Sequence, residues 1–178
     1  ALHKYGIQLM TQNMVGIPDE TRWTALQTID LNYRCQTDTL QVNHYTPHPA
    51  TRLGRYALEK GYFDGTFENL PENFHLHEQM VLNLPDKEDI LALSRLAHAC
   101  LDFRHYLTAV KVVSRLPRPL RRLGYALLEK KAASLHAQGR GHRNTRWRDW
   151  SFLATLRNPY QEHGAAWLEK SRGGATGN

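Results

Sequence analysis

The feature that most constrains the fold is a long helical periodicity in the second half of the chain. From Asp86 onward, apolar residues return every three or four positions, so that one face of a helix stays apolar. Asp86 is a favourable N-cap, but a helix unbroken from there to Leu116 would be long for a chain of this size. Asp102 can cap a second helix. The pattern therefore predicts two helices that meet near Asp102.

A proline-containing turn at 116–119 predicts where the next helix begins. Pro119 suits the first position of a helix, because the N–H group that proline lacks has no partner there in any case. Two more helices are expected at 147–156 and 159–170, and the glycine-rich end at 171–178 is expected to fray. Leucines expected on the core side of the helix after Pro119 are Leu120, Leu123, Leu127, Leu128 and Leu135.

The first 45 residues fit two interpretations. Asp19 and Glu20 are typical of the first turn of a helix, and apolar residues follow at helical spacing. Alternating apolar residues at 29–35, followed by 40–42, would instead form a β hairpin. The helix is favoured, and the hairpin stays open. The apolar positions concerned are Met10, Met14, Val15 and Ile17, expected to supply core, and the helical face Trp23, Leu26, Ile29 and Tyr33.

The middle of the chain predicts one short helix. Prolines at 47 and 49 interrupt the chain, a short helix closed by a glycine follows at 53–61, and 63–85 is expected to be irregular. These elements predict a mainly α fold, a helical bundle with or without a small β hairpin near the N-terminus. Residues 1–178 are expected to form a single helical domain, because this length suffices for one substantial core.

Composition favours a cytoplasmic protein. No apolar run approaches the roughly 18 residues needed to cross a bilayer, and residues 1–5 resemble no signal peptide. Cys35 and Cys100 are too few and too far apart for a disulfide scaffold or a cysteine-based zinc site. Both are expected to be buried free thiols. Neither a membrane partner nor a cofactor is expected.

Positive charge is concentrated in one segment. Residues 104–148 hold 12 Lys and Arg against the single acidic Glu129, whereas residues 1–103 hold 8 Lys and Arg against 13 Asp and Glu. Such segregation creates a field that concentrates polyanions, and basic side chains neutralise phosphates without reading base sequence. Nucleic acid is therefore the favoured partner, single-stranded DNA or RNA above all. An acidic protein and a plain solvated face are the alternatives.

The basic positions expected to contact phosphates lie on predicted helix faces and loops. Each phosphate contact would add to affinity and to its dependence on salt. Tyr125, Trp147 and Trp150 are interleaved with them, and would either stack on unpaired bases or pack in the core. The basic positions are Arg104, Lys111, Arg115, Arg118, Arg121, Arg122, Lys130, Lys131, Arg140, Arg143, Arg146 and Arg148.

Histidines offer an alternative chemistry. His75 and His77, together with Glu78, could hold zinc or iron if they lay on a strand, where positions two apart share a face. His44 and His48 have helical spacing, but a proline lies between them. No HExxH, GxSxG, P-loop or Rossmann pattern is present. The sequence therefore predicts neither a metal site nor a catalytic residue.

Two stretches resemble the small helical subunit of the type I-E CRISPR surveillance complex, Cascade. Residues 53–61, LGRYALEKG, are similar to a family stretch of the form LGR-x-ALxxxG. Residues 86–113 have an Asp-x-x-Asp start, then Leu-Ser-Arg-Leu, and an Asp-Phe pair where the family often has an acidic residue and an aromatic at the head of a helix. Residues 62–85 are longer than the family pattern, and the region after Lys131 has no counterpart.

The resemblance implies a non-enzymatic subunit that lines a groove in a large ribonucleoprotein and contacts DNA phosphates. Arg55 and Arg95 are the basic positions that carry over by matching. The leading hypothesis is thus a non-catalytic nucleic-acid-binding subunit that also contacts other protein subunits of its complex. A protein–protein adaptor with an acidic partner, or a small metal-dependent hydrolase or nuclease, are the alternatives.

Overall fold

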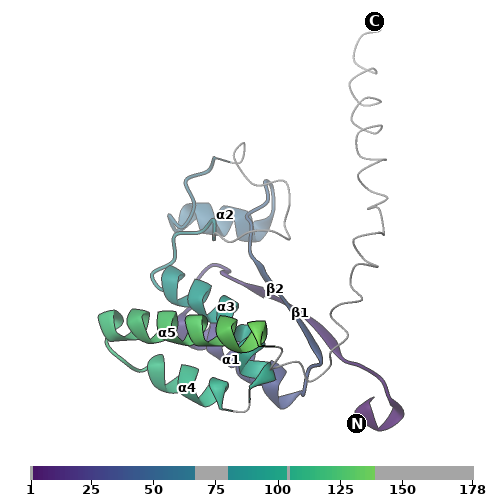
Figure 1. Cartoon of the computed structure of the whole chain (residues 1–178). Helices are drawn as coiled ribbons and strands as arrows, with labels where there is room; N and C mark the ends of the chain where they lie inside the picture. The colour runs from purple at the N-terminus through teal and green to yellow at the C-terminus, as the bar shows by residue number, and fades with distance from the viewer. Residues whose placement is uncertain (1, 67–79, 104, 139–178) are drawn as a thin grey trace, which may run out of the picture. The chain divides into compact units, whose positions relative to one another are not determined.

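The structure, a computed structural model, describes residues 2–66, 80–103 and 105–138 (Figure 1). The chain divides into two compact units, Ala1–Arg143 and Asn144–Asn178, and every described residue belongs to the first. The described elements are mainly helical, as predicted, whereas the helices expected beyond residue 146 lie outside the described residues. In chain order the elements are η1 (Leu2–Tyr5), β1 (Met10–Val15), α1 (Arg22–Arg34), β2 (Thr39–His44), α2 (Arg52–Glu59), α3 (Lys87–Asp102), α4 (Tyr106–Val113) and α5 (Arg118–Ala137).

The two strands pair in parallel, which corrects the predicted hairpin. β1 and β2 run side by side from the Met10–Thr39 pair to the Val15–His44 pair. Parallel neighbours cannot be joined by a tight turn, because the chain must return to the same end of the sheet before the second strand begins. α1 makes that return. The helix and the strand at 40–42, which were alternatives in the sequence, therefore both form.

α1 begins with a reciprocal cap. The Thr24 N–H donates to Thr21 Oγ1 at 3.3 Å, and the Thr21 N–H donates to Thr24 Oγ1 at 3.0 Å. The cap satisfies two N–H groups that the start of a helix leaves unpaired. The predicted apolar face is only partly right, since Trp23 is 40% exposed. The buried residues of α1 are Ala25, Leu26, Ile29 and Asn32.

α3 lies at the centre of the described core, where it packs against α1, α4, α5 and β2. The predicted helix boundary is confirmed, because α3 ends at Asp102 and α4 begins at Tyr106. Asp102 is not the cap of α4, however: its carboxylate lies 3.0 Å from Nε2 of His136 on α5. Burial raises the pKa of the Cys100 thiol to about 12. Cys100 is buried as expected, whereas Cys35 is exposed.

Three of the five leucines predicted on the core side of α5 face outward, and Leu128 and Leu135 face the core, so the predicted core side is only partly right. Leu120, Leu123 and Leu127 are 54%, 58% and 60% exposed. The face that packs against α3 and α4 lies on the opposite side of the helix and contains an arginine. It comprises Arg121, Tyr125 and Ala132, which are buried, and Leu128 and Leu135, which are partly buried.

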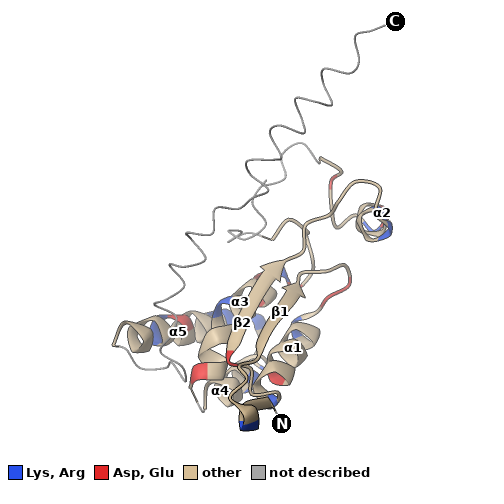
Figure 2. Cartoon of the chain, turned by 90° about the vertical axis from the view of Figure 1, so that its right-hand side faces the viewer, with Lys and Arg blue, Asp and Glu red and all other residues tan. Residues whose placement is uncertain are grey.

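One face of the strand pair is covered by no described element. Val15, Leu40 and Val42 point toward α1 and α3, with which they line a small interior cavity. On the other face Met10 and Met14 are 43% and 57% exposed, although both were expected to supply core. Figure 2 shows the strands in front of α1 and α3. Parallel sheets are normally covered on both faces, so this open face is unusual.

Within the described part of the chain, no helix combines the length and the apolar character that a membrane crossing requires.

Candidate functional site

The carboxyl ends of β1 and β2 lie at the same edge of the sheet, because the strands are parallel and in register. In parallel α/β folds, ligands bind beyond this edge. The chain leaves β1 through 16–20 and β2 through 45–48, and both segments bring polar groups to the edge. Together with two tyrosines from α2 and its exit, these groups form what we name the strand-end cluster. Its members are Asp19, Glu20, Thr46, Tyr56 and Tyr62.

Asp19 has an uncommon backbone conformation, and two phenols bind its carboxylate. Its φ is 65°, a region that residues other than glycine rarely adopt and that is often found at functional sites. The hydroxyls of Tyr56 and Tyr62 donate to its two carboxylate oxygens at 2.6 and 2.7 Å. These hydrogen bonds, first that of Tyr56, lower the pKa of Asp19, and the same bonds raise the pKa of both phenols. Asp19 is therefore an exposed, ionised carboxylate with a fixed orientation.

Glu20 is a buried carboxylate beside it. Its residue is 7% exposed, and its side chain accepts the Gly16 N–H. Burial raises the pKa of Glu20, and the backbone N–H groups of Gly16 and Ile17 offset part of that rise. The environments of Asp19 and Glu20 thus push the pKa values of adjacent carboxyls apart, which is a common property of acid–base sites.

Thr46 contributes a buried hydroxyl. The residue is 5% exposed, and its Oγ1 has no hydrogen-bond partner among the described residues. Most buried hydroxyls in proteins are paired with protein or ordered water, so an orphan of this kind calls for a partner. A polar group of a ligand bound at the strand ends could provide it.

The alternative histidine chemistry is tested only in part by the described residues. His44 Nε2 lies 3.0 Å from Ser94 Oγ, a contact that joins β2 to α3. In residues 2–66, 80–103 and 105–138, no group of three or more His, Cys, Asp or Glu side chains could hold a metal ion. His75, His77 and Glu78 lie outside the described residues, and the metal hypothesis for them stays open.

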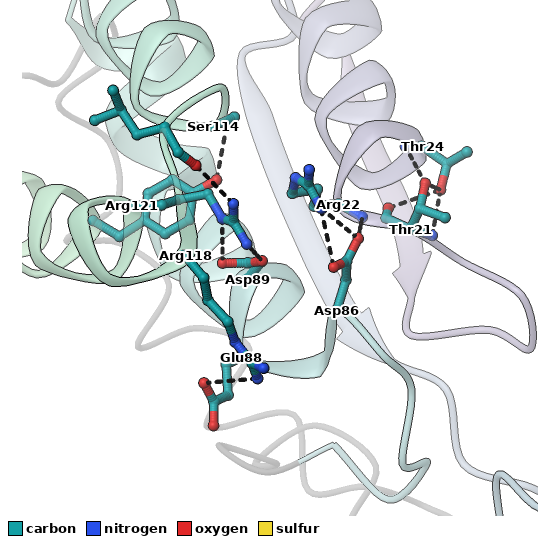
Figure 3. A network of polar contacts seen from close by, with 11 residues as sticks. Thr21, Arg22, Thr24, Asp86, Glu88, Asp89, Ser114, Arg118 and Arg121 are labelled. Atoms are coloured by element: carbon teal, nitrogen blue, oxygen red, sulfur yellow. Dashed lines mark hydrogen bonds and ion pairs between the residues drawn. The ribbon is translucent and has the colours of Figure 1, made fainter.

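Arg121, a predicted phosphate contact, is a buried structural residue. Its Nε and Nη2 donate to the Asp89 carboxylate on α3 at 2.9 and 2.7 Å (Figure 3), and its Nη1 donates to the Leu116 carbonyl at 2.8 Å. The hydrogen bonds to Asp89 raise the pKa of Arg121. With 6% exposure, the guanidinium cannot reach a phosphate in the folded chain. The prediction for this residue is therefore wrong.

Four other positions predicted to contact phosphates form ion pairs with acidic residues of the fold. These pairs are exposed to solvent and worth about 1 kcal/mol or less each, so they leave the cations able to exchange partners. Figure 2 shows the basic and acidic residues on the described elements. The pairs are Arg95–Glu129, Lys111–Asp30, Arg118–Glu88 and Arg122–Glu88.

The remaining basic positions divide into two groups. Arg55, Arg115, Lys130 and Lys131 are exposed and form no ion pair with a described residue. Arg104, Arg140, Arg143, Arg146 and Arg148 lie outside the described residues, as do Trp147 and Trp150. Tyr125 is 2% exposed and its hydroxyl lies 2.8 Å from Ser114 Oγ, so of its two predicted roles the core role is correct.

Sequence reasoning missed the strand-end cluster because it did not recognise β1 as a strand. Residues 10–14 are mostly polar or methionine, which gives weak β periodicity. The available signal was the pair of segments Gly-Ile-Pro-Asp-Glu at 16–20 and Tyr-Thr-Pro at 45–47, each of which follows a strand. Only a parallel pairing brings these segments to one edge.

Comparison with known proteins gives one short similarity. Over 55 residues, the chain is 36% identical to an uncharacterized methyltransferase of Pyrococcus horikoshii. The aligned segment is 31% of this chain and 12% of that protein. No family model and no solved structure matches. The relative is named as an enzyme, and this contradicts the expectation of a non-enzymatic protein. The comparisons do not bear on the resemblance to the Cascade subunit, which stays a prediction.

We expect Arg121→Gln to destabilise the fold by about 3–5 kcal/mol, because it leaves the buried Asp89 carboxylate without its partner. Urea unfolding measures the loss. Arg122→Gln is the matched control, since Arg122 is exposed and its loss should cost about 1 kcal/mol or less. Equal stability of the two variants would contradict the structural role of Arg121.

We expect Glu20→Gln to remove a pH dependence of folding stability. Because the folded pKa of Glu20 is raised, the folded state binds the proton more tightly. The free energy of unfolding should then be highest below the ordinary value of 4.5 and fall as pH rises through the folded pKa. Urea unfolding from pH 4 to 8 tests this, with the exposed Glu59→Gln as control. A Glu20→Gln variant clearly less stable than wild type at pH 7 would contradict it.

Proposed function

We propose that this chain is part of an enzyme of the methyltransferase class and that the strand-end cluster lines its substrate site. The carrying observation is that two adjacent carboxyls with divergent pKa values follow β1, and a buried hydroxyl without a described partner follows β2, at the carboxyl ends of a parallel, in-register strand pair. The similarity to a protein named as a methyltransferase supports the reaction class. Because the chain spans about an eighth of that relative's length, the activity concerns the whole protein.

The cluster has the groups that methyl transfer requires. An oxygen or nitrogen acceptor must lose a proton and be held in line with the donor. Burial raises the pKa of Glu20, so Glu20 is the carboxylate better suited to accept that proton. Asp19, which is ionised and held by Tyr56 and Tyr62, is suited to orient a polar group of the substrate. Thr46 can hold a polar group of the substrate. The carboxylate of Asp19 also fits a cationic donor such as S-adenosylmethionine, which would supply the methyl group.

The open face of the strand pair supports a larger catalytic domain. It carries Met10 and Met14, which are 43% and 57% exposed and which a further layer would cover. Beside them, Gln12 Nε2 on β1 donates to Gln41 Oε1 on β2 at 3.2 Å. A two-stranded parallel sheet with one bare face is not expected to be stable alone. We therefore propose that β1 and β2 belong to a larger parallel sheet, and that α1 and α3 cover one face of that sheet instead of forming a free helical bundle.

Methyl transfer tests the proposal directly. The full-length protein would be incubated with S-adenosylmethionine carrying a labelled methyl group and with small-molecule, protein and nucleic-acid acceptors. We expect transfer, and a loss of about 100-fold in Asp19→Asn, because misplacing a bound substrate by about 1 Å can cost that much. Asp64→Asn is the matched control, since Asp64 is an exposed carboxylate that accepts the Thr66 N–H at 3.0 Å and lies outside the strand-end cluster. No transfer, or equal activity of both variants, would contradict the proposal.

A second candidate function is contact with a nucleic-acid backbone. It is favoured by Arg115, Lys130 and Lys131, which are exposed and unpaired within the described part of the chain. Cations without an internal partner release counterions on binding phosphates, which drives association. This function is compatible with catalysis, because a nucleic acid can be the methyl acceptor.

Fluorescence anisotropy with single-stranded DNA and RNA at several salt concentrations measures this contact. The test variant is Arg115→Gln/Lys130→Gln/Lys131→Gln, and we expect it to bind all sequences more weakly. The plot of log affinity against log salt concentration should be flatter by about two units, because each lost phosphate contact on a single strand contributes roughly 0.7. A control with equal charge change is Lys4→Gln/Arg34→Gln/Arg52→Gln. If both variants lose affinity equally, the effect reflects net charge and the interface lies elsewhere.

A further inference from the structure

A polar groove of about 440 Å³ lies between the exit of α2, the start of α3 and the start of α5. It is lined by residues 60–62, 83–85, 87, 88 and Arg118. Among the described residues, it shares only Tyr62 with the strand-end cluster. The groove therefore offers a second place at which a ligand could bind.

The groove is positively charged. Of the described residues that line it, Lys60, Lys87 and Arg118 are basic and Glu88 alone is acidic. Glu88 is engaged by Arg122 as well, and its contact with Arg118 is long at 3.9 Å (Figure 3). The side chains of Arg118 and Glu88 are 64% and 58% exposed, so their attraction is weak and Arg118 can turn to another anion.

The walls of the groove are joined by backbone and side-chain contacts that place the lysines. The Asn83 N–H donates to the Tyr62 carbonyl at 2.8 Å, which connects the exit of α2 to the segment before α3. Lys87 Nζ donates to Asn83 Oδ1 at 3.1 Å. Lys60 Nζ lies 5.5 Å from the centre of the Tyr56 ring. The cations thus come from three separate elements but border one space.

We propose that this groove binds the phosphate group of a small molecule. Phosphate oxygens accept several charge-assisted hydrogen bonds at once, and a guanidinium can donate two in parallel. The volume falls in the range of about 300–1,000 Å³ that small-molecule sites occupy. A nucleic-acid backbone would instead call for cations repeated along an extended surface. Free phosphate and a phosphorylated metabolite share the recognised group.

Isothermal titration calorimetry with inorganic phosphate, pyrophosphate and a single-stranded oligonucleotide tests the proposal. The variant is Lys60→Gln/Arg118→Gln, in which both residues are exposed, so the fold should be preserved. The matched control is Lys4→Gln/Arg34→Gln, which removes the same residue types from exposed positions elsewhere. Thermal unfolding of all three proteins without ligand verifies that the variants fold.

We expect wild type to bind pyrophosphate in a saturable one-to-one manner, and the groove variant to bind at least about tenfold more weakly through loss of two charge-assisted contacts. The control should stay within about twofold of wild type. Pyrophosphate that binds while inorganic phosphate does not would indicate a phosphorylated metabolite as the natural source. The proposal is overturned if wild type shows no saturable binding to either phosphate, if both variants lose equal affinity, or if only the oligonucleotide binds.

Discussion

The parallel pairing of β1 with β2 is the constraint on which the rest of the described structure depends. It requires a return between the strands, which α1 provides, and it brings the exits of both strands to one edge. α3 then packs against both α1 and β2. The hydrogen bonds from the Arg22 N–H and guanidinium to the Asp86 carboxylate, at 3.0 and 3.1 Å, join the start of α1 to the start of α3 (Figure 3). The strand-end cluster is a consequence of this pairing.

The separation of acidic and basic residues along the sequence stabilises the fold through ion pairs, in addition to any role in binding a partner. Several cations of the basic half pair with carboxylates of the acidic half, most deeply Arg121 with Asp89. Lys111 and Asp30 likewise join α4 to α1. Part of the charge that suggests a polyanion partner is therefore used to hold the helices together. Among the described residues, the exposed cations without a partner and the weakly paired Arg118 of the groove remain available for an external anion.

Sequence periodicity was sufficient to predict helices but not which of their faces is buried. The boundary near Asp102 was predicted correctly, although Asp102 pairs with His136 and does not cap α4. On α5, the leucines at 120, 123 and 127 gave the stronger apolar stripe, yet the face with Arg121 is buried. Charged residues are normally expected on the exposed face of a helix, but Arg121 is buried because it pairs with Asp89 on α3. Since Asp89 lies on another element, the sequence around Arg121 does not indicate this pairing. The strand at 10–15 was missed for a related reason, since parallel pairing joins segments about 29 residues apart.

Amide chemical-shift mapping of the isotopically labelled full-length protein with S-adenosylmethionine tests the central claim most directly, namely that the carboxyl ends of β1 and β2 form a ligand site. We expect saturable shifts concentrated at 16–20 and around Thr46, where the orphan hydroxyl lies. Because this readout reports binding at individual residues, it does not depend on knowing the methyl acceptor. Shifts confined to α5, or none at saturating ligand, would contradict the assignment of the site.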